Sequence, residues 1–286
     1  MSQPRSDWLF GTLRGLALLV LGWTFGALYG LSSLGLHSLF LPIGSMLLGL
    51  PLPRASTAGW ILICCACVGA LVVLVQQIPF HPFILAIWGI YIAAGLTGNG
   101  LLSRRRRSVL QPYLLLLLIA VGAGMVWQAY PTLAEGVFRG TDDRIVLPSQ
   151  RAWWTVSAGA LLAGLLGGIT GLGGGYLLVP ALVLMRIAPH VALWASIWLM
   201  LPLALVSTLV TARRSSPSWL QEGWLGAGAF LGGVAGATWA LSFSAGMLVV
   251  CFGVALMVVA GITWRVVGLV AKATSREDDS GRTGKR

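Results

Sequence analysis

The 286-residue chain is 57% hydrophobic and only 9% charged, and its mean hydropathy of +0.87 excludes a water-soluble domain. The net charge of +11 does not indicate nucleic-acid binding, because its arginines lie between apolar runs and in the C-terminal segment, where membrane orientation accounts for them. The four cysteines lie inside apolar runs without Cys/His metal spacing, so we predict no disulfide, metal site or cofactor. We therefore expect an all-α, polytopic membrane protein.

Apolar runs divide the chain into ten segments. The second and the seventh are shorter than the ~20 residues that a helix needs to cross a bilayer, and each follows a break rich in glycine or serine. In chain order the runs cover residues 13–31, 34–50, 57–75, 80–102, 110–130, 153–172, 176–188, 191–210, 220–241 and 244–270.

The arginines distinguish two arrangements of these runs. If each short run completes the crossing begun by its predecessor, the chain crosses eight times, and arginines 104–107 fall on the opposite side from Arg213 and Arg214. If each short run returns as a hairpin, both termini are cytoplasmic, and 15 of the 19 Lys and Arg lie inside. The positive-inside rule favours the second arrangement, with five segments in each half.

An internal repeat agrees with this count. Pro42, Pro51 and Trp60 recur 138 residues later as Pro180, Pro189 and Trp198, and 26–30 recurs as 167–171. Because five segments is an odd number, two such repeats insert with opposite topology, as in many secondary transporters. We expect a first transmembrane repeat over 1–130, an extracytoplasmic loop over 131–151, a second repeat over 152–270 and a disordered cytoplasmic tail over 271–286.

The breaks are the candidate solute site. A broken helix inside lipid needs protein or a water-filled cavity to satisfy its freed amides, and the helix that begins there offers unpaired N–H groups and a positive dipole end to an anion. An alternative role for the hydroxyls is to satisfy freed backbone carbonyls, and for paired small residues to pack helices closely. The candidate substrate-binding residues are Gly171, Gly173, Gly174, Gly175 and Thr170 in the second half, and Tyr29, Ser32 and Ser33 in the first.

Charged groups are scarce within the spans. Of the eight Asp and Glu, seven lie outside the predicted spans, and Glu222 falls in the first turn of one. Intramembrane carboxylates commonly carry protons and sodium, so this pattern argues against an enzyme and against a carboxylate-coupled cation porter. It suits an anionic solute. The row Gly228, Gly232 and Gly236 is typical of helix packing.

The second half resembles the TauE/SafE sulfite exporter family. The resemblance lies in Gly171-Leu172-Gly173-Gly174-Gly175, the apolar run 176–180 that ends in a proline, the second proline Pro189, and the small-residue helix start at 192–196. The first half departs from this pattern, with Leu31-Ser32-Ser33-Leu34 in place of a glycine cluster. The resemblance implies export or uptake of sulfite, sulfonates or related organosulfur anions across the cytoplasmic membrane of a bacterium.

From these observations we expect a multi-pass secondary transporter or permease for a small anion, working by alternating access around the two breaks. The alternative is a non-transporting membrane subunit or scaffold with a degenerate transport site. The expected partners are the small anionic solute and the lipid bilayer, and the sequence is compatible with a homo-oligomer.

Overall fold

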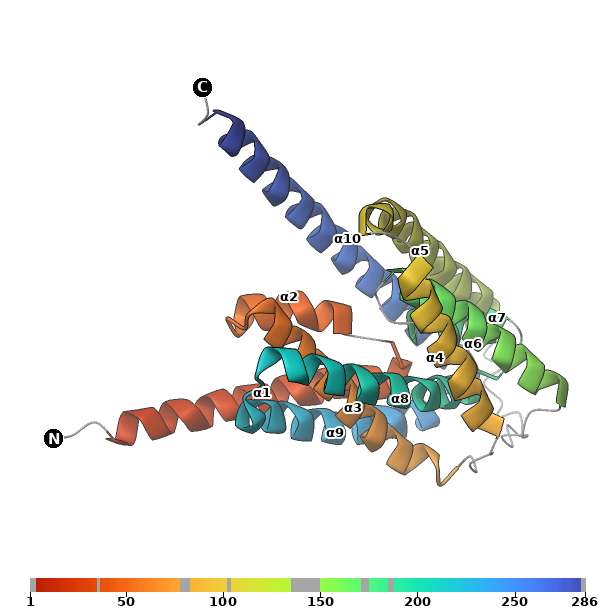
Figure 1. Ribbon diagram of the computed structural model, residues 1–286. Coiled ribbons are helices and arrows are strands. Elements are labelled where there is room, and N and C mark those ends of the chain that lie inside the picture. The colour runs from red at the N-terminus through yellow and green to blue at the C-terminus, as the bar shows by residue number, and fades with distance from the viewer. Residues whose placement is uncertain are drawn as a thin grey trace.

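The computed structural model describes residues 4–34, 37–77, 83–101, 104–134, 150–170, 175–184 and 188–283, which form helices and no β-strand. The first half contains α1 (Pro4–Ser32), α2 (His37–Leu47), α3 (Leu52–Leu74), α4 (Phe83–Leu101) and α5 (Arg104–Ala134). The second half contains α6 (Gln150–Thr170), α7 (Gly175–Leu184), α8 (Pro189–Ser215), α9 (Trp219–Ser242) and α10 (Ala245–Thr283). Figure 1 shows their arrangement.

The chain is an integral membrane protein. Five of its described helices contain segments long and apolar enough to cross a bilayer, and they belong to α1, α3, α8, α9 and α10. Helices α2 and α7 have only 11 and 10 residues, so each is too short to cross alone. The last helix, α10, continues to Thr283 through the segment expected to be a tail.

Helices α1 and α9 form the most extensive helix interface in the described chain, and they lie side by side (Figure 1). The row Gly228, Gly232 and Gly236 packs its α-carbons against the backbone of α1, so the predicted packing role of this row is confirmed. The glycines of α1 pack on α9 in return. The backbone oxygen of Leu225 fills the place where a Cβ on Gly22 would stand. In the same way Gly26 meets the backbone oxygen of Ala229, and Gly30 meets that of Gly233. Because the paired numbers rise together, α1 and α9 run parallel.

Helix α3 lies against α8 and α9, while α4 pairs with α6 and α5 pairs with α10. Glycines again allow the closest approaches: a Cβ on Gly164 of α6 would stand 2.7 Å from the backbone oxygen of Tyr91 in α4. Gly122 of α5 and Gly253 of α10 meet each other's backbone oxygens in the same way. Small residues serve this purpose in membranes, where lipid competes for apolar contact and close backbone packing supplies the attraction.

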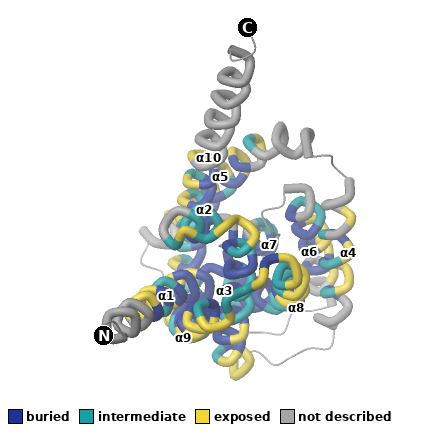
Figure 2. The backbone as a smooth tube through the Cα atoms, turned by 60° about the vertical axis from the view of Figure 1, so that its left-hand side comes forward, coloured by how far each residue is buried: buried dark blue, intermediate teal, exposed yellow. Residues whose placement is uncertain are grey.

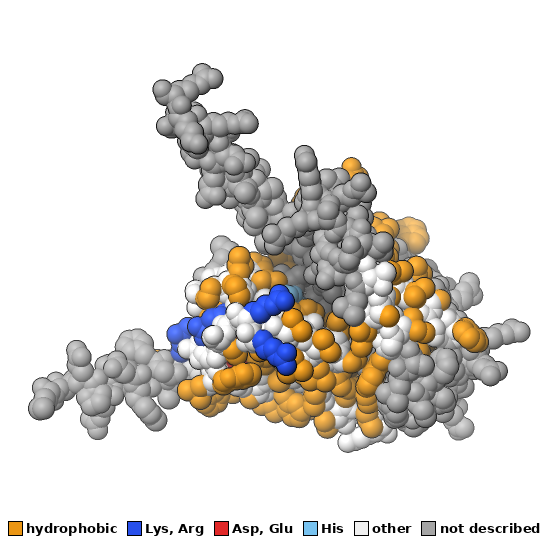
Figure 3. All heavy atoms as spheres, in the orientation of Figure 1, with side chains coloured by type: hydrophobic (Ala, Val, Ile, Leu, Met, Phe, Trp, Pro, Cys, Tyr) orange, Lys and Arg blue, Asp and Glu red, His pale blue; other side chains and the backbone are white. Residues whose placement is uncertain are grey.

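The chain brings several distant segments together at one end of the bundle, which we call the arginine end. A pocket there is lined by Arg14 of α1, by Leu48 and Leu50 after α2, and by Gln221 in the first turn of α9. The hydroxyls of Thr57 in α3 and Ser215 in α8 also lie 2.7 Å apart, beside the arginines of the last turn of α8. Arginine side chains gather at this end in Figure 3. Helix α2 therefore returns to the end where the apolar part of α1 begins.

The buried core is shared by both halves of the chain (Figure 2). Its largest fully buried side chains include Tyr29, Phe40, Trp194 and Phe252. Leucines elsewhere in the same helices face outward, as Leu116, Leu209 and Leu231 do, each more than half exposed. An apolar exterior around an interior with some polar groups is the pattern expected in lipid.

Candidate functional site

The first break lies between α1 and α2. Helix α1 ends at Ser32, and Ser33 adopts a positive φ of 49°, a left-handed conformation uncommon for residues other than glycine. The Ser33 backbone N–H still donates to the Tyr29 carbonyl, which closes the last turn. Serine at this position therefore takes the backbone geometry that a glycine would adopt more readily.

Ser32 has a local role in the structure. Its hydroxyl donates to the backbone oxygen of Leu28 over 2.6 Å and lies 3.4 Å from the backbone nitrogen of Leu34. The hydroxyl thus satisfies a carbonyl near the helix end, which is the alternative role that its residue type suggested. The Ser32 hydroxyl therefore stabilises the end of α1 at the break.

Ser33 connects the two halves. Its hydroxyl donates to the hydroxyl of Ser196 in α8 over 2.9 Å, and both side chains are fully buried. Ser196 lies inside the segment 192–196 that carried the family resemblance, but its part in the site was not predicted. This hydrogen bond places the first break directly against the second half of the chain.

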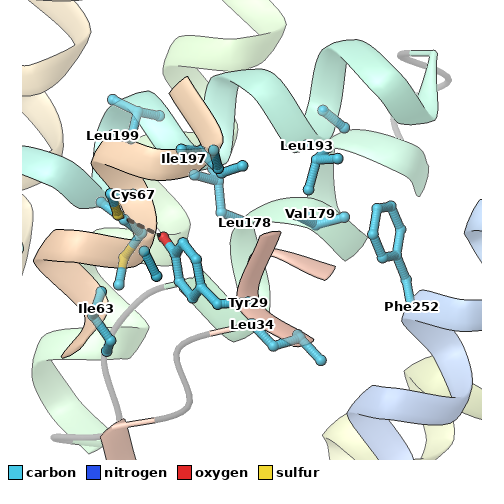
Figure 4. Packing of buried hydrophobic residues seen from close by; sticks show 14 of the residues in the cluster. Tyr29, Leu34, Ile63, Cys67, Leu178, Val179, Leu193, Ile197, Leu199 and Phe252 are labelled. Carbon is cyan, nitrogen blue, oxygen red and sulfur yellow. Dashed lines mark hydrogen bonds between the residues drawn. The ribbon is translucent and has the colours of Figure 1, made fainter. Parts of the chain in front are cut away.

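Tyr29 also lies at this junction, with none of its surface exposed. Its hydroxyl accepts a hydrogen bond from the Cys67 thiol of α3 over 3.1 Å. Figure 4 shows Tyr29 pointing toward Cys67, with Leu178 of α7 and Ile197 of α8 also in view. The three candidates of the first half thus lie together, and two of them contact residues outside their own helix.

The second break is described at its two edges. Thr170 is the last residue of α6, and Gly175 is the first residue of α7 and is buried. The other candidates of this half, Gly171, Gly173 and Gly174, lie outside the described residues. One turn into α7, Leu178 and Val179 are fully buried in the core and lie between α8 and Phe252 of α10 in Figure 4.

A tryptophan cluster between α4 and α8 was not predicted. The ring of Trp198 lies 6.0 Å from that of Trp88 and 6.4 Å from that of Trp194, centroid to centroid. The indole nitrogens of Trp88 and Trp194 are buried and have no hydrogen-bond acceptor in the structure. A buried N–H without an acceptor costs roughly 1–3 kcal/mol, and such groups call for a bound water, an ion or a functional role. The spacing of Trp194 and Trp198, four residues apart in an apolar run, was the available signal.

Two histidines lie near the ends of helices. His37, the first residue of α2, stacks on Trp60 at 4.4 Å between centroids, and its Nε2 lies 3.3 Å from the Ser56 hydroxyl. His190, in the first turn of α8, has its Nε2 3.2 Å from the Phe243 carbonyl oxygen. His37 is buried beside the first break, whereas His190 belongs to a helix-end contact.

The polar side chains described around the first break are hydroxyls, the Cys67 thiol and the His37 imidazole. Among the described buried residues, Glu222 is the only acidic one, and it lines the pocket at the arginine end with Arg14. Within the same residues no three His, Cys, Asp or Glu side chains are grouped so as to hold a metal ion. The break can therefore offer uncharged hydrogen-bond donors to an anion.

Comparison with known proteins found a similarity in the second half of the chain. The family model described as "Sulfite exporter TauE/SafE" matches residues 156–285, a range that begins within α6 and includes all of α7, α8, α9 and α10. The resemblance predicted from the glycine-rich stretch is thereby confirmed over this part of the chain. Comparisons with curated proteins and with solved structures found no match.

Proposed function

We propose that the protein is a secondary transporter for a small anion, most simply sulfite or an organic sulfonate. The observation that carries the proposal is the pair of short helices, α2 and α7, whose first residues His37 and Gly175 are both buried inside the bundle. The TauE/SafE match over residues 156–285 supports the class of solute.

The lengths of the short helices fit this proposal. At 1.5 Å per residue, the 11 residues of α2 extend ~16 Å, about half of the ~30 Å hydrocarbon core. A helix that starts near mid-membrane presents free N–H groups and the positive end of its dipole there. An anion bound between two such ends meets no buried carboxylate among the described residues of the breaks.

Neutral donors at the first break and in the tryptophan cluster between α4 and α8 support an oxyanion as the solute. Hydroxyls of Ser33 and Ser196 lie at the first break, and the indole N–H groups of Trp88 and Trp194 lack an acceptor. Oxyanions accept hydrogen bonds on all of their oxygens, and charge-assisted hydrogen bonds are roughly twice as strong as neutral ones. A bound anion would supply the acceptors that the two indole N–H groups lack.

We further propose that the halves are inverted repeats, which is the basis for alternating access. In such a repeat each helix of the first half corresponds to the helix five places later, so that α1 corresponds to α6 and α2 to α7. The α1–α9 pair then corresponds to the α6–α4 pair, and the α2–α10 pair to the α7–α5 pair. All four pairs are in contact. Pro42 and Pro180, 138 residues apart, both lie inside the short helices. Pro51 directly precedes α3, and Pro189 is the first residue of α8.

The arginine end is the cytoplasmic end in this proposal. Arg14, Arg54, Arg213 and Arg214 belong to segments that meet there, and positive charge is retained on the cytoplasmic side of bacterial membranes. The return of α2 to this end supports the hairpin form of the first unit. The membrane in question is then the bacterial cytoplasmic membrane.

Transport in proteoliposomes tests the function. Purified protein is reconstituted, and uptake of labelled sulfite, ethanesulfonate, sulfate and acetate is measured against protein-free vesicles. We expect saturable movement of sulfite or the sulfonate. Movement of acetate alone would overturn the sulfur-anion assignment, and movement of none of the four by monodisperse protein would favour a non-transporting membrane subunit.

A further inference from the structure

Glu222 is the acidic residue of α9 that lines the pocket at the arginine end. Its side chain is only 6% exposed, and its Oε2 atom is buried without a hydrogen-bond partner. The apolar side chains of Leu18, Leu48 and Leu225 line the same pocket. A buried carboxylate oxygen with no donor is costly when ionised, and a proton is the simplest group that satisfies it.

Charged and polar groups face Glu222 from the neighbouring elements. Arg14 of α1 and Gln221 of α9 line the pocket with it, and Arg54 of α3 interacts with it electrostatically. The backbone of Ser218 also hydrogen-bonds to the carboxylate, while the Arg54 Nε atom is buried without a partner. The two arginines therefore favour the ionised carboxylate, whereas burial beside the leucines favours the protonated form.

The turn of α3 that forms part of the pocket wall also contacts the start of α2. Ala58 of α3 forms part of this wall, and the next residue, Gly59, lies against the ring of His37 at the start of α2. Protonation of Glu222 removes one negative charge beside Arg14 and Arg54. The pocket then attracts an anion more strongly.

We propose that this pocket is a proton-binding site and that Glu222 carries the proton that moves with the anion. This inference rests on the proposed transport function and names its coupling ion. The step forms one O–H bond, between a carboxylate oxygen and a proton taken from water, and breaks it again when the proton returns to water as the anion is released. No other bond changes.

A helix-end role is the competing explanation. Glu222 lies in the first turn of α9, where a carboxylate stabilises the positive end of the helix dipole and caps the Ser218 N–H. That role needs the ionised form only. It predicts a loss of stability in Glu222→Gln without any change in how transport depends on protons.

Infrared difference spectroscopy of the purified full-length protein tests proton binding without reference to transport. Spectra recorded across pH 4–9 should contain a protonated-carboxyl C=O band that is absent from Glu222→Gln and returns in Glu222→Asp at a shifted frequency. Identical pH-dependent spectra for wild type and Glu222→Gln would overturn the proposal. This outcome is independent of whether any anion is transported.

The coupling is tested in proteoliposomes containing a pH-sensitive dye. Ethanesulfonate is the probe, because it stays ionised over this range and brings no proton of its own. An inward proton gradient should stimulate uptake several-fold in wild type and in the control His190→Gln, and should leave Glu222→Gln unstimulated. Proton-stimulated uptake by Glu222→Gln would refute the coupling. If the infrared band of Glu222 titrates but the protein transports no anion, the transport function alone would be refuted.

Discussion

The backbone oxygen of Trp23 in α1 fills the place where a side chain on Gly232 of α9 would stand. The two helices therefore touch through their backbones at this level. We predict that Gly232→Ala destabilises the protein by about 1–3 kcal/mol or more, because neither backbone can move aside without separating the helices. The effect is measured by thermal unfolding of the protein in detergent, monitored as the loss of monodisperse protein.

Gly223 of the same helix is the matched control. A Cβ at that position would meet nothing within 4 Å, so Gly223→Ala should be neutral or should stabilise the helix by up to ~1 kcal/mol. Equal destabilisation by both substitutions would show that the helix backbone itself, and not its contact with α1, is sensitive to alanine.

The packing of these helices was largely predictable from sequence, because small residues repeated every four positions indicate a close helix contact whatever the partner. The partner was not predictable. The row Gly228, Gly232 and Gly236 could have faced any helix, and the complementary row on α1 was not recognised, since chain order gives no information on which segments meet across a bundle.

Membrane orientation is tested with single cysteines in a background that lacks the four native ones. Gln76 follows α3, and Ser216 follows α8; both are exposed. In the ten-segment arrangement they face opposite sides, and only Gln76→Cys should react with an impermeant thiol reagent added outside whole cells. The eight-crossing arrangement puts both on one side, so equal labelling of the two cysteines would contradict the inverted repeat.

The Ser33–Ser196 hydrogen bond joins the halves, and its energy can be measured by a double-mutant cycle. Ser33→Ala and Ser196→Ala should each cost about 1 kcal/mol, and the double variant should cost less than their sum because only one bond is lost. Ser33→Gly should be less harmful than Ser33→Ala, since glycine adopts the positive φ of 49° without strain. Fully additive losses would mean that the hydroxyls do not stabilise each other.

The candidate site was predictable only in part. Breaks before His37 and before Gly175 follow from short apolar runs beside glycine and serine, and the helix bounds agree with them. The roles of individual hydroxyls did not follow: Ser32 bonds within its own helix end, whereas Ser33 reaches α8. Glu222 was expected in the first turn of a span, but its burial was not predicted: packing against its neighbours leaves it only 6% exposed, which no local pattern encodes.

The indole of Trp194 separates a structural role from a solute-binding one. Trp194→Phe removes the N–H and part of the ring, and these two losses affect stability in opposite directions. The small cavity destabilises the protein by up to a few kcal/mol. Removal of the unpartnered donor stabilises it by roughly 1–3 kcal/mol. If the N–H binds the anion, KM for sulfite or the sulfonate should rise about tenfold or more, because a hydrogen bond to a charged group contributes ~1.5–3 kcal/mol.

Trp154, which is 72% exposed, provides the control, and Trp154→Phe should keep both the stability and the KM of wild type. The informative measurement for Trp194→Phe is KM against kcat at equal amounts of inserted protein, since a purely structural defect lowers the amount of active protein without changing the KM of the remainder. An unchanged KM for every transported anion would remove Trp194 from the solute site and leave its N–H as an energetic cost of packing α8 into the core.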